Sequence, residues 1–216
     1  MHASNAWETQ DGKVIVQGFR SEPTPNECYL NKFAPSYYYE YSIDLKTGLV
    51  TEQTLNPYEI VEFPVINEKL NGQACPSVYA LSTKSIGGPL EVYSQPTTGV
   101  TFDSVVKFAA KAQNGSQKGE VIGRFQLDER WFAVSEPTVV PKENKEGEYI
   151  LLIATRFPPG MKWRDVARDY DGASLVSKVF ILDGDNFDDG PVYSATLPHH
   201  VPYGLHSGFI DWEHMK

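Results

Sequence analysis

The spacing of short apolar runs is the feature that most constrains the fold of this chain. Runs rich in Val, Ile, Tyr and Phe alternate with Gly, Asn, Asp and Pro at intervals that suit strands and turns rather than helices. The sequence therefore predicts an all-β protein. Strands are expected over Lys13–Gly18, Tyr37–Leu45, Leu49–Leu55, Ser104–Phe108, Val121–Gln126, Tyr149–Thr155, Lys178–Leu182 and Val192–Leu197.

Two turn-forming segments predict hairpins. Lys46-Thr47-Gly48 separates two of the expected strands, and its glycine can adopt the positive φ that tight turns require. A second hairpin is expected to turn within Asp183–Gly190, whose spacing of carboxylates does not match a calcium-binding loop. Helical periodicity is weak, and its best candidate is a single turn within Trp163–Asp171, in a segment that we interpret as a loop insertion.

The chain is expected to form one continuous β architecture. With 216 residues, of which 41% are hydrophobic, it is long enough to bury a core, and no linker or internal repeat divides it. Meandering strands of this kind occur in sandwiches, barrels and propellers alike. The pattern alone does not choose among these folds.

Charge and cysteine content exclude several classes of protein. A net charge of -9 without clustered Lys or Arg argues against a nucleic-acid surface. The only cysteines, Cys28 and Cys75, cannot build a disulfide framework, and each is expected to be a buried or free thiol rather than a nucleophile.

No secretory signal is recognisable, so a cytoplasmic or plastid location is expected rather than secretion. Contact with a membrane surface stays open.

The string LPHHVPYGLHSGF, at residues 197–209, is the most informative for chemistry. A strand is expected to end before a proline-containing turn that presents His206, so the imidazole can be aimed with little entropy left to lose. From the residues alone, a single histidine in this setting is more often a hydrogen-bonded core residue than a metal ligand. The earlier His199 and His200, and His214 in the polar tail, are expected to be surface or hydrogen-bonded residues.

This string resembles the C-terminal signature of the carotenoid cleavage oxygenase family, a Val-Pro-Tyr-Gly-Phe-His-Gly type of sequence. His206 matches the last of that family's four iron-binding histidines, although Leu205 replaces the usual Phe and Ser207 the usual Gly. The opening MHASNAWETQDG is similar to the family's His-x-x-Asn-Ala-(aromatic)-Glu segment, which places His2 on the third ligand. The resemblance therefore implies that His2 and His206 bind a ferrous ion.

Two further segments match the family in the expected order. VEFPVIN, at residues 61–67, resembles a Glu-Phe-Pro-x-Ile-Asn segment, and SEPTVVPK, at residues 135–142, resembles a Glu-Pro-x-x-Val-Pro segment. By this resemblance, Glu62 and Glu136 accept hydrogen bonds from the ligand imidazoles. A carboxylate on the other ring nitrogen fixes the tautomer of a metal-bound histidine and raises its basicity.

The family resemblance implies a seven-bladed β-propeller with iron on its axis. The 216 residues are then expected to supply the later blades of one propeller domain, with the N-terminal blades and two upstream histidines missing. Such a fragment is expected to bind iron weakly and to be inactive alone, since a cut propeller exposes unpaired strand edges and His2 lies at a terminus.

The implied reaction is that of an iron(II) dioxygenase, which uses O2 to cut a conjugated carbon–carbon double bond of a carotenoid or apocarotenoid into two carbonyl products. Imidazole ligands suit ferrous iron, and no organic cofactor is required. The substrate is expected to be an apolar polyene. Phe63, Tyr203 and Phe209 are candidates to line its cavity, but each is more easily explained as propeller core.

Three alternatives stay open from the sequence. Within the same family, the substrate could be a stilbene-type olefin instead of a polyene. The chain could also belong to a propeller-type binding module without chemistry. A hydrolytic metalloenzyme that uses His2 and His206 with a water is disfavoured, because the sequence contains no HExxH motif.

Overall fold

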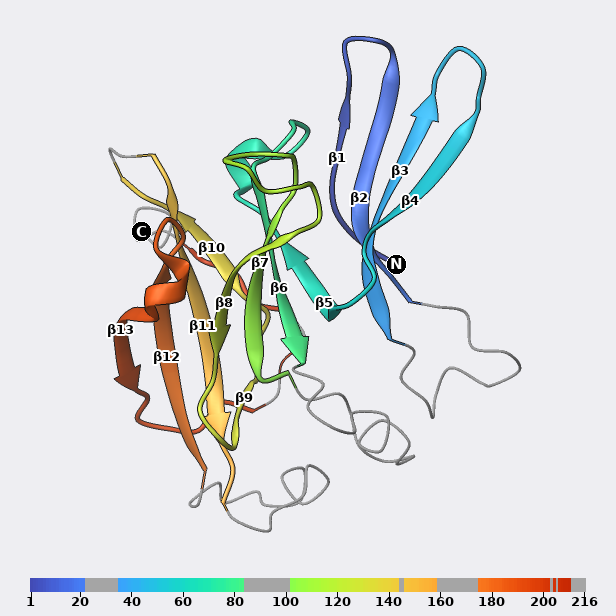
Figure 1. The fold of residues 1–216 in the computed structure, drawn as a ribbon. Helices are drawn as coiled ribbons and strands as arrows, with labels where there is room; N and C mark the ends of the chain where they lie inside the picture. Colours follow the sequence, from blue (N-terminus) through green and yellow to red (C-terminus); the bar gives the residue numbers. More distant parts are fainter. Residues whose placement is uncertain are drawn as a thin grey trace, which may run out of the picture.

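The fold is all-β, as predicted, and it consists of three antiparallel sheets that lie side by side (Figure 1). The computed structural model describes residues 1–21, 35–83, 102–143, 146–158, 175–202, 204 and 206–210. The segment expected to form a helical turn, Trp163–Asp171, lies outside these residues. Among the described residues, no helix is long and apolar enough to cross a membrane.

The main path of each sheet is a simple meander, in which the order of strands in space follows their order in the chain. The first sheet contains β1 (His2–Glu8), β2 (Lys13–Ser21), β3 (Ser36–Asp44) and β4 (Val50–Asn56). The second contains β5 (Ile60–Val65), β6 (Ser77–Thr83), β7 (Ser104–Ala109) and β8 (Val121–Gln126), with a short 3₁₀ turn, η1 (Glu68–Leu70), after β5.

The third sheet follows the same plan with one addition. Its main path contains β10 (Thr138–Pro141), β11 (Glu148–Arg156), β12 (Val176–Asp183) and β13 (Pro191–Thr196), and the short β9 (Trp131–Ala133) pairs with β11. A second 3₁₀ turn, η2 (Phe187–Asp189), lies in the β12–β13 connection. Three successive four-stranded meanders of this kind are the blades of a partial β-propeller.

Both predicted hairpins form. At the first tip, Gly48 takes a φ of 71° and its N–H donates to the Asp44 carbonyl at 2.8 Å. The Asp44 side chain also accepts from the N–H groups of Lys46 and Thr47, as expected for an aspartate at a turn. All of the predicted strands coincide with observed ones to within a residue at most positions, whereas β1, β5, β6, β9 and β10 were not predicted.

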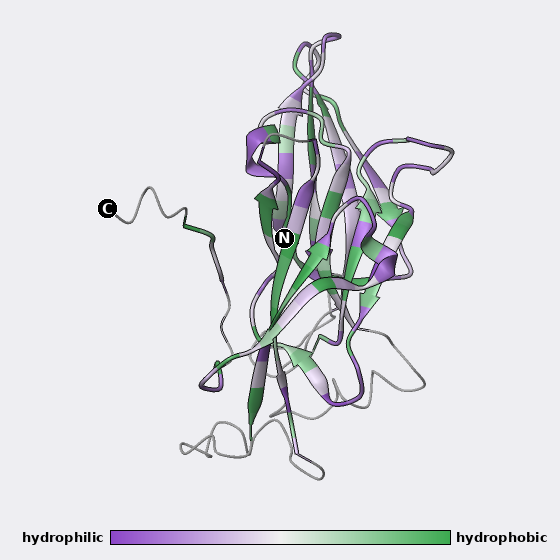
Figure 2. Cartoon of the chain, turned by 90° about the vertical axis from the view of Figure 1, so that its left-hand side faces the viewer, coloured by the Kyte–Doolittle hydropathy of each residue, from purple (hydrophilic) through white to green (hydrophobic). Residues whose placement is uncertain are grey.

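The second sheet is buried on both faces, which holds the three sheets together. On β6, Val78 and Ala80 face a core shared with the first sheet, while Tyr79 and Leu81 face a core shared with the third. This is the period of two that a strand imposes. In Figure 2, hydrophobic residues (green) are found mainly on the strands, and hydrophilic residues (purple) mainly on the turns between them. Each fully buried large apolar side chain contributes roughly 1.5–3 kcal/mol to such a core.

A buried polar network also joins the first two sheets. Gln17 is fully buried and donates from Nε2 to Glu40 at 2.8 Å and to the carbonyl of Ala110 at 2.9 Å. Its Oε1 accepts from the Tyr38 hydroxyl at 2.7 Å, and Lys118 pairs with Glu40 at 2.5 Å. Because every polar atom named here has a partner, the network fixes the packing of the two sheets at little desolvation cost.

A prediction concerns Gly119, where the connection between β7 and β8 packs against Leu55 of β4. This residue has a φ of +85°, and a Cβ there would lie 2.4 Å from the Leu55 carbonyl oxygen. We expect Gly119→Ala to lower the free energy of unfolding by more than about 2 kcal/mol, because backbone strain and overpacking add. The measurement is urea unfolding followed by circular dichroism.

The matched control is Gly72→Ala, which has a φ of +79° but no atom within 4 Å of the added Cβ. This variant should lose only the cost of a left-handed alanine, about 1 kcal/mol. Equal unfolding midpoints for the two alanine variants would show that the contact with Leu55 carries no energy.

Candidate functional site

His2 and Glu62 form a hydrogen-bonded pair between the first strands of two neighbouring sheets. His2 begins β1, Glu62 lies in β5, and Nδ1 of the imidazole is 2.6 Å from Oε2 of the carboxylate. The imidazole side chain is 52% exposed, whereas the carboxylate side chain is only 14% exposed. The carboxylate is thus the fixed partner, and the ring projects from it.

Glu62 is itself held from two directions. Ser36, fully buried in β3, donates from its hydroxyl to Oε1 at 2.8 Å. The backbone N–H of Phe63 donates to Oε2 at 3.3 Å, the same oxygen that contacts His2. A carboxylate fixed in this way can orient an imidazole through its Nδ1.

The second pair joins His206 to Glu136. Nδ1 of His206 lies 3.2 Å from Oε2 of Glu136, and the backbone N–H of Ser207 donates to the other carboxylate oxygen at 2.8 Å. The Ser207 hydroxyl donates to the Glu136 carbonyl at 2.9 Å and lies 2.8 Å from the hydroxyl of Thr138. The imidazole side chain is 75% exposed and the carboxylate again 14%.

The chain around His206 is tied to the start of the third sheet. The N–H of Gly204 donates to the carbonyl of Val134 at 2.7 Å, just before the segment that carries Glu136. This bond and the contacts of Ser207 hold the chain on both sides of the histidine. The turn residues Tyr203 and Leu205 lie outside the described residues.

The two imidazoles converge on Phe63. The centroid of the Phe63 ring lies 5.9 Å from that of His2 and 6.3 Å from that of His206. Histidines separated by most of the chain therefore lie beside the same aromatic side chain of β5. Sequence reasoning assigned Phe63 only to a cavity wall or to core, and it assigned no role to Ser36 or Ser207.

The donor set suits a metal that prefers imidazole. In both histidines Nδ1 faces a carboxylate, so the lone pair available to a metal is that of Nε2. No group of three or more His, Cys, Asp or Glu side chains with metal-binding geometry occurs among the described residues. The two Nε2 atoms could therefore supply two ligands of a metal centre.

The remaining histidines and the two cysteines were expected to be surface, hydrogen-bonded or core residues. His199 is exposed and His200 half-buried after β13, while His214 and Cys28 fall outside the described residues. Cys75 is buried, and burial raises the pKa of its thiol, as expected of a core cysteine.

The remaining surface candidates also resolve into ordinary roles. Asp183 and Asp185 both pair with Lys142, at 2.6 and 2.8 Å, so one cation from the β10–β11 connection is shared by two carboxylates of the acidic hairpin. Phe209 is 54% exposed and therefore belongs to no core in the described residues.

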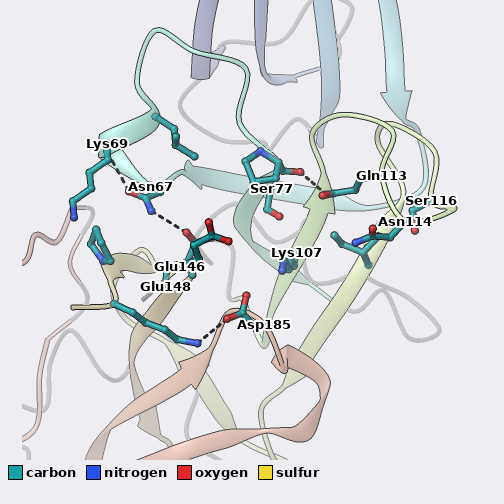
Figure 3. Close-up of a pocket in the computed structure, with 16 residues that line it drawn as sticks. Asn67, Lys69, Ser77, Lys107, Gln113, Asn114, Ser116, Glu146, Glu148 and Asp185 are labelled. Carbon is teal, nitrogen blue, oxygen red and sulfur yellow. Dashed lines mark hydrogen bonds and ion pairs between the residues drawn. The ribbon is translucent and has the colours of Figure 1, made fainter. Parts of the chain in front are cut away.

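A polar cavity of about 720 Å³ lies between the second and third sheets (Figure 3). Asn67 and Glu148 face each other there, and the amide of Asn67 donates to the carboxylate at 3.0 Å. The hydroxyl of Tyr79 donates to the other oxygen of Glu148 at 2.9 Å, and burial raises the pKa of Tyr79. Lys107 donates to the carbonyl of Gly184 at 2.6 Å. Because these polar groups bind one another, we interpret the network as a structural connection between the second and third sheets.

A prediction follows from the close packing beside His2. Gly18 of β2 lies opposite Ala3 of β1. A Cβ added to Gly18 would lie 2.4 Å from the His2 carbonyl oxygen and 2.8 Å from the Ala3 Cα. We expect Gly18→Ala to push the start of β1 outward and to break the contact between His2 and Glu62. The change would appear as shifted His2 ring resonances in imidazole ¹⁵N–¹H correlation spectra.

Gly208→Ala is the control, because its added Cβ meets no atom within 4 Å. Unchanged His2 resonances in Gly18→Ala would mean that the histidine–glutamate contact does not depend on the close approach of β2.

The chain is similar to known proteins over nearly its whole length. The family model described as Retinal pigment epithelial membrane protein (RPE65) matches residues 1–211. Among curated proteins, carotenoid 9,10(9',10')-cleavage dioxygenase 1 of Arabidopsis thaliana is 26% identical over 227 residues, and the enzyme of Crocus sativus is 24% identical over 231 residues. The match covers 100% of this chain but only 37% of each of these relatives.

Solved structures give the same picture of the fold. A crystal structure of an ACO/RPE65 chimera matches with a TM-score of 0.69 and 19% identity, covering 96% of this chain and 38% of that one. Cobalt-substituted Synechocystis ACO matches with a TM-score of 0.66 and 20% identity, covering 95% and 38%. The likeness supports the partial propeller that the sheets define.

Proposed function

The chain belongs to the RPE65/carotenoid cleavage oxygenase family, and from this membership we propose that its native polypeptide is an iron(II)-dependent dioxygenase that cleaves a conjugated double bond of a carotenoid or apocarotenoid. The co-substrate is O2, and the products are two carbonyl compounds. The curated relatives that match this chain carry the name of carotenoid cleavage dioxygenases, which supports this substrate class.

The observation that carries the proposal is the convergence of two carboxylate-backed imidazoles on one aromatic ring. His2 and His206 come from opposite ends of the described chain, and each presents Nδ1 to a largely buried glutamate. Two solvent-facing surface histidines would not each require a carboxylate held by further hydrogen bonds. The arrangement supports roles for both as iron ligands through Nε2.

Residues of this chain orient the two candidate ligand imidazoles. Glu62 and Glu136 occupy the Nδ1 side of each ring, so Nε2 is the nitrogen of each imidazole that would face a metal. Ser36 and the N–H of Ser207 hold the two carboxylates in turn. When bound, iron supplies activation of O2, whose two oxygen atoms end in the two carbonyl products.

The remaining ligands are proposed to come from parts of the native polypeptide beyond these 216 residues. The chain spans 37% of the length of the curated relatives, and the described residues hold a pair of candidate ligands rather than four. We accordingly propose that residues 1–216 are the later blades of one propeller domain, and that they are inactive alone.

The first test measures the reaction. Native polypeptide loaded with Fe(II) should convert a C40 carotenoid or an apocarotenoid to shorter aldehydes or ketones, detected by liquid chromatography with mass spectrometry. With ¹⁸O2, each product should carry label at its new carbonyl. A stilbene run in parallel distinguishes the related substrate class, and turnover of the stilbene alone would contradict the carotenoid assignment. Absence of turnover with bound iron would favour a binding module.

The second test measures metal content. We expect His2→Ala and His206→Ala to abolish stoichiometric iron binding, because each removes a ligand. His199→Ala, which removes an exposed histidine outside the site, should leave iron content unchanged. Iron is measured by plasma mass spectrometry after dialysis against a weak chelator. Full iron content in both ligand variants would show that the site lies elsewhere.

A milder effect is expected at the carboxylates. Glu136→Gln keeps the size of the side chain but removes the negative charge that polarises His206, so iron affinity should fall by about 10- to 100-fold. The exposed Glu143→Gln is the matched control and should bind iron as the parent protein does. Affinity is obtained by competition with a chromogenic chelator.

A further inference from the structure

Phe63 has an unusual backbone for an aromatic residue in a strand. Its φ is +57°, in the left-handed region that bulky side chains rarely occupy. The register of β5 against β6 is interrupted at the same place, between Glu62 and Val65. Strain of this kind persists where the surrounding structure demands it, and it gathers at functional sites.

The consequence is that two consecutive side chains reach the same imidazole. In a regular strand Glu62 and Phe63 would point to opposite faces of the sheet. Here Glu62 accepts the hydrogen bond from His2, and the ring of Phe63 lies 5.9 Å from the ring of His2 at an interplanar angle of 36°. The left-handed residue thus brings a second contact to a histidine that already has one.

The contact with Phe63 restricts a rotation of the imidazole that the hydrogen bond to Glu62 leaves free. One hydrogen bond at Nδ1 fixes a point on the imidazole but leaves the ring free to turn about that bond, which swings the Nε2 lone pair. Phe63 packs beside His2 and, edge to face at 80°, beside His206. Phe63 is itself packed at 82° against Phe102, which is almost fully buried. The core therefore reaches both rings through a single side chain.

We propose that Phe63 is a positioning residue that sets the planes of both candidate ligand imidazoles, His2 and His206, by means of its left-handed backbone. This inference rests on the proposed metal site and adds to it a residue that contacts the ligands without binding metal. The left-handed φ is maintained because it puts Glu62 and Phe63 on the same imidazole.

The test uses Co(II) as a spectroscopic probe in the native polypeptide. Phe63→Gly accepts a φ of +57° without strain, so it removes the ring while keeping the backbone. We expect its Co(II) dissociation constant to rise about 10-fold or more, in the range found for residues that support metal ligands. The visible ligand-field bands of the bound Co(II) should also broaden and shift. Phe63→Tyr keeps the ring and should restore both affinity and spectrum.

The control is Phe180→Gly, which removes a half-buried aromatic ring of β12 that packs against Phe125 and Trp131. It should lower the unfolding temperature but leave Co(II) affinity and spectrum unchanged. Phe63→Leu, which keeps apolar bulk without a flat ring, serves if the glycine variant does not fold, and it should show the same spectral change.

The outcomes separate the two proposals. If the parent protein binds Co(II), His2→Ala does not, and the Phe63 variants match the parent in affinity and spectrum, the positioning role is wrong while the metal site stands. If the parent protein binds no Co(II), the proposed metal site fails, and the role of Phe63 fails with it.

Discussion

The hydrogen bond between His2 and Glu62 spans two sheets, and the candidate site depends on that junction. Because the two residues lie on the first strands of neighbouring sheets, their distance is set by how the sheets pack. Asn5 reinforces the junction three residues after His2. Its buried side chain donates to the carbonyl of Gln73 at 2.7 Å and accepts from the N–H of Gly72 at 3.1 Å. The site is therefore a property of sheet packing rather than of one loop.

The packing that supports this junction is unequal across the molecule. The second sheet is covered on both faces, while β4 and β13 carry mostly exposed residues, among them Val50, Val192 and Tyr193. The strands that begin each sheet, β1, β5 and β10, carry or directly follow His2, Glu62 and Glu136. The carboxylates that back the exposed candidate ligands are thus largely buried, whereas β4 and β13, the last strands of the first and third sheets, are mostly exposed.

The sequence predicted the outer strands better than the strands that build the site, and the reason is physical. Strands such as β11, with the sequence EYILLIATR, contain a run of apolar and β-branched residues that is typical of a strand. By contrast, β1 has the polar sequence HASNAWE and a register shift between Ala3 and Asn5, and β5 contains Pro64 and its own register shift. Local rules fail where a strand must aim side chains at a site. The residues alone drew attention to His206, but only the family resemblance assigned His2, Glu62, Glu136 and His206 to a metal site.

The VEFPVIN segment, residues 61–67, combines several structural roles in and just after β5. Glu62 holds an imidazole, and the left-handed Phe63, at a cost of about 1–3 kcal/mol, turns its ring to the same side. Pro64 follows where β5 leaves its register with β6, so its missing N–H costs no bond of the ladder. Asn67 caps η1 by accepting from the N–H of Lys69, and it donates to Glu148 of the third sheet. This one segment therefore connects the second sheet to the first through Glu62 and His2, and to the third through Asn67 and Glu148.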